Sequence, residues 1–266
     1  MASDSSPPSS FLSIEHAGKT YGSGSEALEA LRGVTFDVPA RQFVSLLGAS
    51  GCGKSTLLMM IAGLEPASVG RISVGGQAVT KPRPDVGIIF QDATLLPWAS
   101  ALENIMFPIE IMRRRPADYE ARARELLRLV GLEGAEGKKP RQLSGGMRQR
   151  VAICRALIHN PSLLLMDEPF SALDAITRDE LNVALLDIWE RFHQTAIFVT
   201  HSIREAVYLS DRVVVLGGKP AGVIEDMPIP FERPRTVEIG DTPEFNRICA
   251  HLRAKIAVGH AAQRSA

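Results

Sequence analysis

The stretch that most constrains this 266-residue chain is "GASGCGKST", which fits the pattern G-x-x-x-x-G-K-[ST]. It follows the apolar run "FVSLL" and precedes "LLMMIAGL", which predicts a strand, a glycine-rich loop and a helix. Successive backbone N–H groups of such a loop wrap a β-phosphate, Lys54 reaches the β- and γ-phosphates, and the Ser55 hydroxyl binds Mg²⁺. A glycine-rich surface turn is a much weaker interpretation of so complete a match. We therefore assign the whole loop to nucleotide binding: Gly48, Ala49, Ser50, Gly51, Cys52, Gly53, Lys54, Ser55 and Thr56.

Further apolar runs alternate with helix-like segments, which predicts an α/β fold with a mostly parallel sheet. Short β-like runs open the chain, and a segment with helical periodicity interrupts the strands at about residues 92–160. Residues 1–10, "MASDSSPPSS", are expected to form a disordered tail. The main domain then covers residues 11–230, and residues 231–266 form a C-terminal extension with weak helical character.

The bulk composition limits the partners of the chain. Lys plus Arg and Asp plus Glu both total 30, so the formal net charge is zero and no nucleic-acid partner is expected. Three cysteines without framework spacing indicate a reducing compartment. No apolar stretch approaches the roughly 20 residues of a membrane-spanning helix, and the start does not resemble a secretory signal. Any link to a membrane is therefore expected to come through a partner.

A second acidic motif, "LLLMDEP" at residues 163–169, places two carboxylates at the end of an apolar strand. Charges there are costly unless they are used. We expect Asp167 to hold Mg²⁺ through water and Glu168 to polarise an attacking water. The alternative is a strand-end turn with solvated acids, which the phosphate loop makes less attractive.

Three more side chains are candidates on weaker grounds. His201 follows the apolar run "AIFVT" and is expected to contact a γ-phosphate or to hold the water and Glu168, although a lone histidine there is more often structural. Gln91 follows "GIIF" and can touch both Mg²⁺ and the water, yet Gln is common at strand ends. Tyr21 can stack on adenine or cover a sheet edge.

The segment "LSGGMRQR", residues 143–150, predicts a second anion site far from the phosphate loop. Gly145 and Gly146 allow close backbone approach, and the helix that follows offers free N–H groups and a partial positive charge. Ser144 as a simple helix N-cap is the plainer interpretation, and both can hold together.

Taken in order, "GASGCGKST", "FQD", "LSGGMRQR", "LLLMDEP", "SALD" and "THS" resemble the nucleotide-binding subunits of ABC transporters over roughly residues 12–230. "LLPW" followed by "ENI" is most similar to the branch that imports nitrate, sulfonate, taurine and bicarbonate. The resemblance implies a P-loop ATPase core with a mostly parallel sheet, an N-terminal antiparallel β subdomain and an inserted helical subdomain. It also implies hydrolysis of ATP to ADP and phosphate, with Mg²⁺, on the cytoplasmic face of a bacterial inner membrane, where the chain would be peripheral.

In that family two subunits pair head to tail around two ATP molecules. The resemblance then assigns Ser144, Gly145 and Gly146 to the γ-phosphate bound by the partner copy. Asp174 of "SALD" would cross the interface near the partner's phosphate loop. Met147 departs from the commonest signature, which has Gln there, so a contact of that amide would be missing while the serine and glycines remain.

The resemblance further implies a polytopic permease and, indirectly, an extracytoplasmic substrate-binding protein. Leu95, Leu96, Pro97 and Trp98 would contact the permease, unless Trp98 packs inward against the helical segment. A non-transport ABC ATPase of DNA repair, translation or cluster assembly remains the alternative, and a nucleotide-binding module without turnover is disfavoured by Glu168 and His201. The transported substrate, and import rather than export, stay open at this point.

Overall fold

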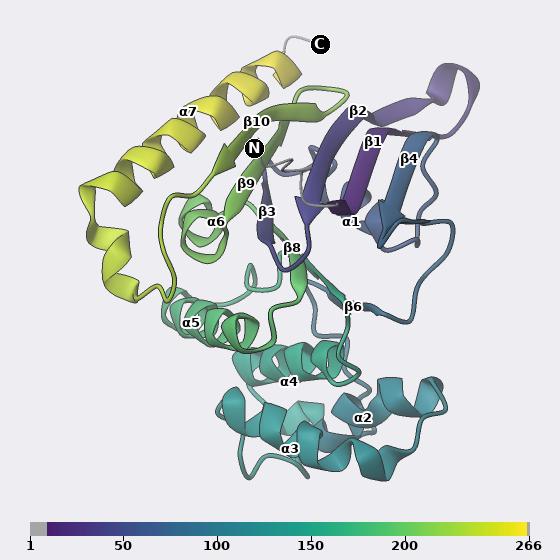
Figure 1. Ribbon diagram of the computed structural model, residues 1–266, viewed down its shortest axis with the longest axis vertical. Coiled ribbons are helices and arrows are strands. Elements are labelled where there is room, and N and C mark those ends of the chain that lie inside the picture. The colour runs from purple at the N-terminus through teal and green to yellow at the C-terminus, as the bar shows by residue number, and fades with distance from the viewer. Residues whose placement is uncertain (1–9, 265–266) are drawn as a thin grey trace, which may run out of the picture.

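The computed structural model describes residues 10–264 and contains two sheets. The smaller sheet is antiparallel, with the order β2-β1-β4-β5, and is formed by the N-terminal part of the sequence, coloured purple to blue in Figure 1. Because Ser10 already pairs with Pro39, the expected tail is one residue too long, and residues 1–9 lie outside the described part. The strands of this sheet are β1 (Ser10–Tyr21), β2 (Leu28–Pro39), β4 (Val69–Val74) and β5 (Gln77–Ala78).

The larger sheet has six strands in the order β10-β9-β3-β8-β7-β6. All neighbours are parallel except β10, which pairs antiparallel with β9. Both β3 and β8 are buried along their whole length, as expected of central strands covered on two faces. The prediction of a mostly parallel α/β core is therefore confirmed. Its strands are β3 (Phe43–Leu47), β6 (Val86–Ile89), β7 (Leu163–Asp167), β8 (Thr195–Thr200), β9 (Arg212–Gly217) and β10 (Gly222–Pro228).

Between β6 and β7 the chain is helical, which confirms the inserted helical subdomain. Helices α2 and α3 lie farthest from the small sheet, and α4 runs between them and α5 (Figure 1). A capping box fixes the start of α2: Glu103 N–H donates to Ser100 Oγ at 3.3 Å and Ser100 N–H donates to Glu103 Oε2 at 2.6 Å. The elements are α2 (Ala101–Ile111), α3 (Glu120–Leu129), α4 (Gly145–Leu157) and the 3₁₀ turns Pro116–Asp118 and Pro140–Gln142.

The remaining helices cover the two faces of the large sheet. The C-terminal helix packs along β9 through Phe245, Ile248 and Leu252, so the extension is a docked helix (Figure 1). No helix within residues 10–264 is both long and apolar enough to cross a bilayer. These helices are α1 (Lys54–Ile61), α5 (Ala175–Phe192), α6 (Ile203–Leu209) and α7 (Pro243–Arg264), with 3₁₀ turns η1 (Gly24–Glu26) and η4 (Val237–Asp241).

The side chains of β3 divide the core between the two faces of the large sheet. Val44 and Leu46 pack with α1 and the small sheet. Phe43 packs toward α5, where its ring lies 5.6 Å from the Trp189 ring in an edge-to-face arrangement. With both faces covered, ligands are most readily reached at the ends of the strands.

Candidate active site

The candidate residues gather at the carboxyl ends of four neighbouring parallel strands. β3 leads into the phosphate loop, β8 into His201, β7 ends at Asp167, and β6 ends two residues before Gln91. Because β3, β8, β7 and β6 are adjacent in that order, these ends form one edge of the sheet. In open α/β sheets this edge is where ligands bind. The topology thus brings together groups that are far apart in the sequence.

The backbone of the phosphate loop depends on glycine. Gly51 and Gly53 have φ angles of 77° and 90°, a region that other residues rarely adopt. A Cβ at Gly48 would lie 2.5 Å from the Leu216 carbonyl oxygen, and one at Gly53 would lie 2.7 Å from Leu31 Cδ2. The loop therefore keeps a compact shape and delivers the N-terminus of α1, where unpaired N–H groups favour an anion.

Lys54 is folded back into this loop. Its side chain is only 4% exposed, and Nζ donates to the carbonyl oxygens of Gly48 at 2.9 Å and Ala49 at 3.0 Å. Nζ also lies 3.6 Å from Glu168 Oε1. The cation is thus held at the loop, in position to exchange these acceptors for phosphate oxygens.

The two acids at the end of β7 have different surroundings. Asp167 Oδ1 accepts a hydrogen bond from Ser55 Oγ at 2.9 Å, and burial raises the pKa of Asp167 despite that bond. Glu168 Oε2 lies 2.8 Å from His201 Nδ1. A hydroxyl beside a carboxylate is a set of oxygen donors that suits Mg²⁺.

The backbone at Glu168 is unusual. Its φ of 44° lies in the left-handed region, which a non-glycine residue adopts only at a cost. Glu168 N–H donates to the Val199 carbonyl at 2.9 Å, and Ser171 Oγ donates to the Glu168 carbonyl at 2.9 Å. These bonds hold the turn, so the carboxylate points at Lys54 and His201 rather than along the strand.

Gln91 and Tyr21 are less closely tied to this cluster. The Gln91 side chain is exposed and makes no hydrogen bond within residues 10–264, so it is not joined to Ser55 or Asp167. Tyr21 ends β1 with 37% of its surface exposed, and Lys19 Nζ lies 4.9 Å from the centre of its ring. Adenine stacking and metal contact by these residues stay predictions.

The signature residues form a second group, on the N-terminal turns of α4 and α5. Ser144 Oγ accepts from Met147 N–H at 3.2 Å, so the simple cap exists. Asp174 caps α5 by accepting from Thr177 N–H at 3.0 Å and Thr177 Oγ1 at 2.8 Å. A Cβ at Gly146 would lie 2.6 Å from Thr177 Cγ2, so the two helix starts are in contact.

The structure does not bring this second group to the phosphate loop of its own chain. Lys54 and Ser55 bond within the loop and to the end of β7, whereas Ser144 bonds only within α4. Figure 1 places α4 with the helical segment, on the opposite side of the large sheet from α1. The two groups to which the sequence assigns anions are thus separate within one chain, and anion binding at each stays a prediction.

Two residues on α4 hold the loop after β6 and were not predicted. Gln149, which is buried, donates from Nε2 to the Phe90 carbonyl at 3.1 Å. Arg155 donates to the carbonyls of Ala93 at 2.7 Å and Thr94 at 2.9 Å. The only sequence signal for a residue that holds a neighbouring loop is a polar side chain on the buried face of a helix. Which face is buried becomes known only from the packed structure.

The loop held by α4 carries the apolar cluster. Trp98 is 69% exposed, so the alternative in which it packs inward is wrong. Leu95, in contrast, packs partly against the core of the helical segment. The main chain between them is fixed by Asn104, whose Oδ1 accepts from Leu96 N–H at 2.7 Å. The exposed indole is thus presented on an ordered loop.

Comparison with known proteins places this site in a family. Residues 31–171 match the family described as ABC transporter. The taurine import ATP-binding protein TauB of Rhizobium johnstonii is 44% identical over 91% of this chain and 95% of its own length. The nitrate import ATP-binding protein NrtD of Synechococcus elongatus is 44% identical over 90% and 88%. A dimeric ATP-binding cassette in a post-hydrolysis state, bound to ADP and Pi, is 32% identical and superposes with a TM-score of 0.73 over 83% of this chain and all of that one.

Proposed function

The chain belongs to the ABC transporter family, and on that premise we propose that it is the ATP-hydrolysing subunit of an importer for a small anion or similar solute, such as nitrate, a sulfonate or taurine. The observation that carries the enzymatic part is the contact of Glu168 with both Lys54 and His201 at the end of the phosphate loop. The names of the relatives carry the substrate class.

In the proposed reaction the loop N–H groups and Lys54 hold the β- and γ-phosphates of ATP. Glu168 accepts a proton from the attacking water, and His201 keeps its carboxylate in place from 2.8 Å away. Lys54 offsets negative charge on the transferring phosphoryl group, a stabilisation that is strong because the ammonium is buried. The products are ADP and phosphate.

Ser55 and Asp167 would hold a Mg²⁺ ion, and Gln91 would join them after a movement of its loop. When bound, the ion neutralises phosphate charge. Ser55 and Asp167 already face one another at 2.9 Å, so this part of the site is preformed. Deprotonated Asp167 is the form that binds, and a nearby cation would restore the ionisation that burial disfavours.

Two copies of the chain complete the site. Ser144, Gly145 and Gly146 of one copy would meet the γ-phosphate held by the other, and Asp174 would approach the partner's phosphate loop. The separation of the two anion-binding features within one chain supports this arrangement, as does the dimeric form of the related cassette. Tyr21 would stack on the adenine.

The loop with Leu95, Leu96, Pro97 and Trp98 is the proposed contact with a polytopic permease. An exposed indole on an ordered loop is the kind of anchor that protein interfaces use. The chain would then be peripheral on the cytoplasmic face of a bacterial inner membrane, with an extracytoplasmic substrate-binding protein as an indirect partner.

Co-purification from gently solubilised native membranes tests the proposal. A tagged chain should recover a polytopic membrane protein in stoichiometric amount, and Trp98→Ala should lose it while keeping ATP hydrolysis. Recovery only with ribosomes, DNA or a soluble scaffold would overturn the transport role and favour a non-transport ABC ATPase. Absence of MgATP turnover in the complex would overturn the enzymatic role.

A further inference from the structure

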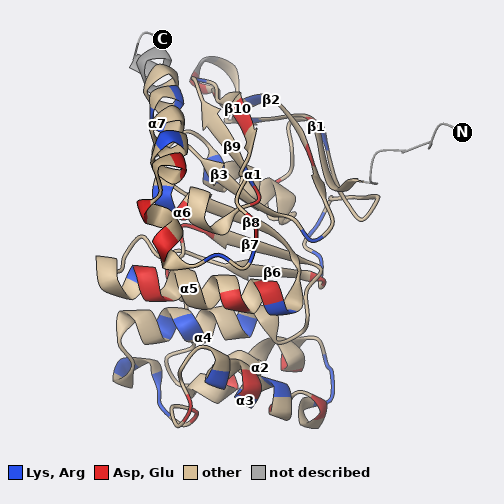
Figure 2. Ribbon diagram, turned by 60° about the vertical axis from the view of Figure 1, so that its left-hand side comes forward, with Lys and Arg blue, Asp and Glu red and all other residues tan. Residues whose placement is uncertain are grey.

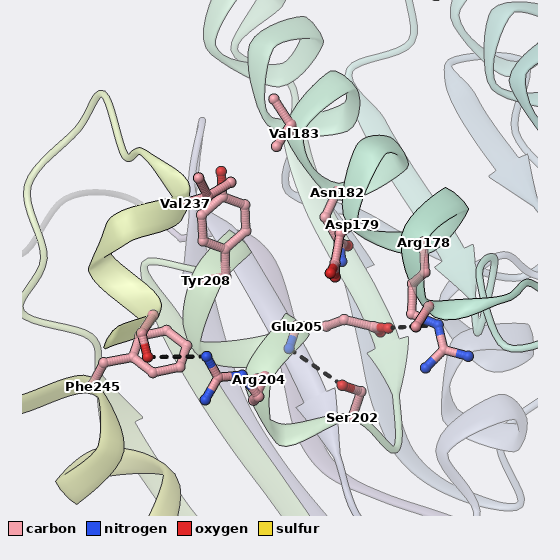
Figure 3. A pocket seen from close by; sticks show the side chains of 12 residues that line it. Arg178, Asp179, Asn182, Val183, Ser202, Arg204, Glu205, Tyr208, Val237 and Phe245 are labelled. Atoms are coloured by element: carbon pink, nitrogen blue, oxygen red, sulfur yellow. Dashed lines mark hydrogen bonds and ion pairs between the residues drawn. The ribbon is translucent and has the colours of Figure 1, made fainter. Parts of the chain in front are cut away.

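A cavity of about 320 Å³ lies between α5, α6 and the C-terminal segment (Figure 3), and no residue of the phosphate loop is among those that line it. Its polar lining comes from Arg178, Asp179 and Asn182 on α5 and from Arg204 and Glu205 on α6. Tyr208, Val237 and Phe245 contribute an apolar side. The volume falls in the range of small-molecule sites, which combine apolar walls with a few placed polar groups.

The wall on α5 presents acceptors that the chain does not use. Asn182 is only 7% exposed, and its Oδ1 has no hydrogen-bond partner among the described residues. The Asp179 carboxylate makes no ion pair within residues 10–264. Figure 3 shows both side chains pointing from α5 into the space toward α6. Asp179 is exposed to solvent, whereas Asn182 Oδ1 is a buried acceptor, and such an acceptor is costly unless a donor reaches it.

Both cations of the cavity already have acceptors within the chain. Arg178 donates from Nη2 to the Leu173 carbonyl at 2.9 Å, and its Nε lies 3.6 Å from Glu205 Oε1 without a hydrogen bond. Arg204 donates to the Gly240 carbonyl at 3.0 Å and lies over the Phe245 ring at 5.0 Å. An anionic ligand would have to break these contacts, whereas a cationic donor would find Asp179 and Asn182 free.

We propose that this cavity binds a small organic ammonium ion. Its N–H groups would donate to the Asp179 carboxylate and to Asn182 Oδ1, and its apolar body would lie against Val183, Tyr208 and Val237. Burial raises the pKa of Glu205, against the lowering effects of the Thr200 hydrogen bond and of the Arg178 and His201 charges, and the Asp179 charge adds a smaller upward effect.

The walls of the cavity are connected to the proposed ATP site. Arg178 holds the Leu173 carbonyl, next to Asp174. Glu205 accepts from Thr200 Oγ1 at 2.7 Å, next to His201. A ligand that stiffens or shifts this wall would therefore change ATP turnover. This consequence rests on the proposed function, whereas binding itself does not.

Calorimetric titration of the nucleotide-free full chain with benzylammonium chloride at pH 7 tests the site. We expect saturable one-site binding with a Kd in about the millimolar range, as suits a fragment-sized ligand. Benzyl alcohol and benzoate, which share the ring but lack the ammonium, should bind at least about tenfold more weakly. Equal binding of either, or no binding of benzylammonium, would overturn the proposal.

Substitutions in the cavity test which residues contact the bound ammonium group. Asp179→Asn should weaken binding at least about tenfold, and Asn182→Leu should also weaken it while leaving the fold intact, as checked by thermal unfolding. Glu180→Gln is the matched control, because Glu180 is the next acid on α5 and pairs outside the cavity with Arg150 at 3.0 Å. Loss of affinity in Glu180→Gln equal to that in Asp179→Asn would overturn the assignment.

The link to the ATP site has its own measurement. Saturating benzylammonium should change the kcat for ATP by at least about twofold in the native chain, and by much less in Asp179→Asn, which does not bind it. Binding with an unchanged kcat would overturn the link and leave the binding site standing. Failure of ATP turnover in every sample would instead count against the proposed function.

Discussion

The phosphate-loop side of the molecule, around Lys54 and Glu168, and the signature side, around Ser144 to Gly146, differ in the groups that surround the predicted anion. On the first, Glu168 contacts both Lys54 and His201, so the cation, the proposed base and the histidine beside it lie together within one chain. On the second, Ser144 to Gly146 offer a capped helix start, and no acidic or basic side chain of residues 10–264 hydrogen-bonds to the Ser144 side chain. The comparison teaches that, under the proposed function, a single copy would hold the groups for binding nucleotide, while the donors on its other side would meet a phosphate held by a second copy.

The largest expected effect comes from removing the acid on the first side. Glu168→Gln keeps the side-chain size but removes the base, so ATP turnover should fall about 10²- to 10⁴-fold while ATP binding persists. Phosphate release and fluorescent-nucleotide binding measure the two quantities, with Glu180→Gln as the control. Turnover near the native rate would show that Glu168 is not the base.

The second side is tested by crowding it. In Gly146→Ala the new Cβ would lie 2.6 Å from Thr177 Cγ2 and push the starts of α4 and α5 apart. We expect about a tenfold loss of turnover, since the misfit is of order 1–3 kcal/mol, with ATP binding by the dilute single chain unchanged.

Thr177→Ser supplies the matched rescue. It removes the Cγ2 methyl and keeps the hydroxyl that donates to Asp174 at 2.8 Å. The double variant should regain most of the lost turnover. If Gly146→Ala instead weakened ATP binding by a single copy, the two sides would not be separable in the way described above.

Cys52 provides a chemical test of the phosphate loop alone. A bulky group on this thiol should abolish ATP binding, and prior MgATP should protect. The thiol is buried, and burial raises its pKa, so alkylation should be slow at pH 7 and faster at higher pH as thiolate forms. Timed alkylation followed by nucleotide binding measures this. Equal sensitivity of Cys52→Ala to the reagent would disprove the assignment.

The smallest expected effect concerns the stability of the empty site. Burial raises the pKa of Asp167 in the folded chain, so its ionised form destabilises the fold above that pKa, and the cost vanishes as the pH falls below about 4. Asp167→Asn should therefore raise Tm by about 1–2 °C at pH 7, a discounted figure because the carboxylate is partly solvated. Calorimetric melting at pH 7 and pH 4 should show the difference only at pH 7. A lowered Tm at both would contradict it.

The sequence predicts well which residues gather at this edge of the large sheet, because each of them follows an apolar run of a buried strand. Lys54, Asp167, Glu168 and His201 are all recognisable in this way, and the strand order brings them together. The same rule placed Gln91 in the set, yet its side chain is exposed and unpaired in the described chain. A place at the end of a strand fixes the backbone position of a residue but not the direction of its side chain.

Other features lie beyond a local pattern. β10, "GVIEDMP", is a half-exposed antiparallel edge strand without an apolar run, so its composition resembles that of a loop. The exposure of Trp98 depends on how the helical segment packs, because an apolar residue suits either a core or an interface. Asn182 and Asp179 become part of a candidate site only because α5, α6 and α7 enclose a cavity, and no short stretch of sequence encodes that arrangement.

Helix α4, with 13 residues, connects the signature residues to the loop that carries Trp98. Its first turn carries Ser144 to Gly146, and its later turns hold the Phe90, Ala93 and Thr94 carbonyls of the loop that presents Trp98. Basic positions on α4 lie beside acidic positions on α5 (Figure 2), and Arg150 of α4 pairs with Glu180 of α5 at 3.0 Å, so the helix is also held to its neighbour. A rod about 20 Å long cannot move at one end alone. Under the proposed function, engagement of the partner's phosphate and displacement of the indole would therefore be one mechanical event.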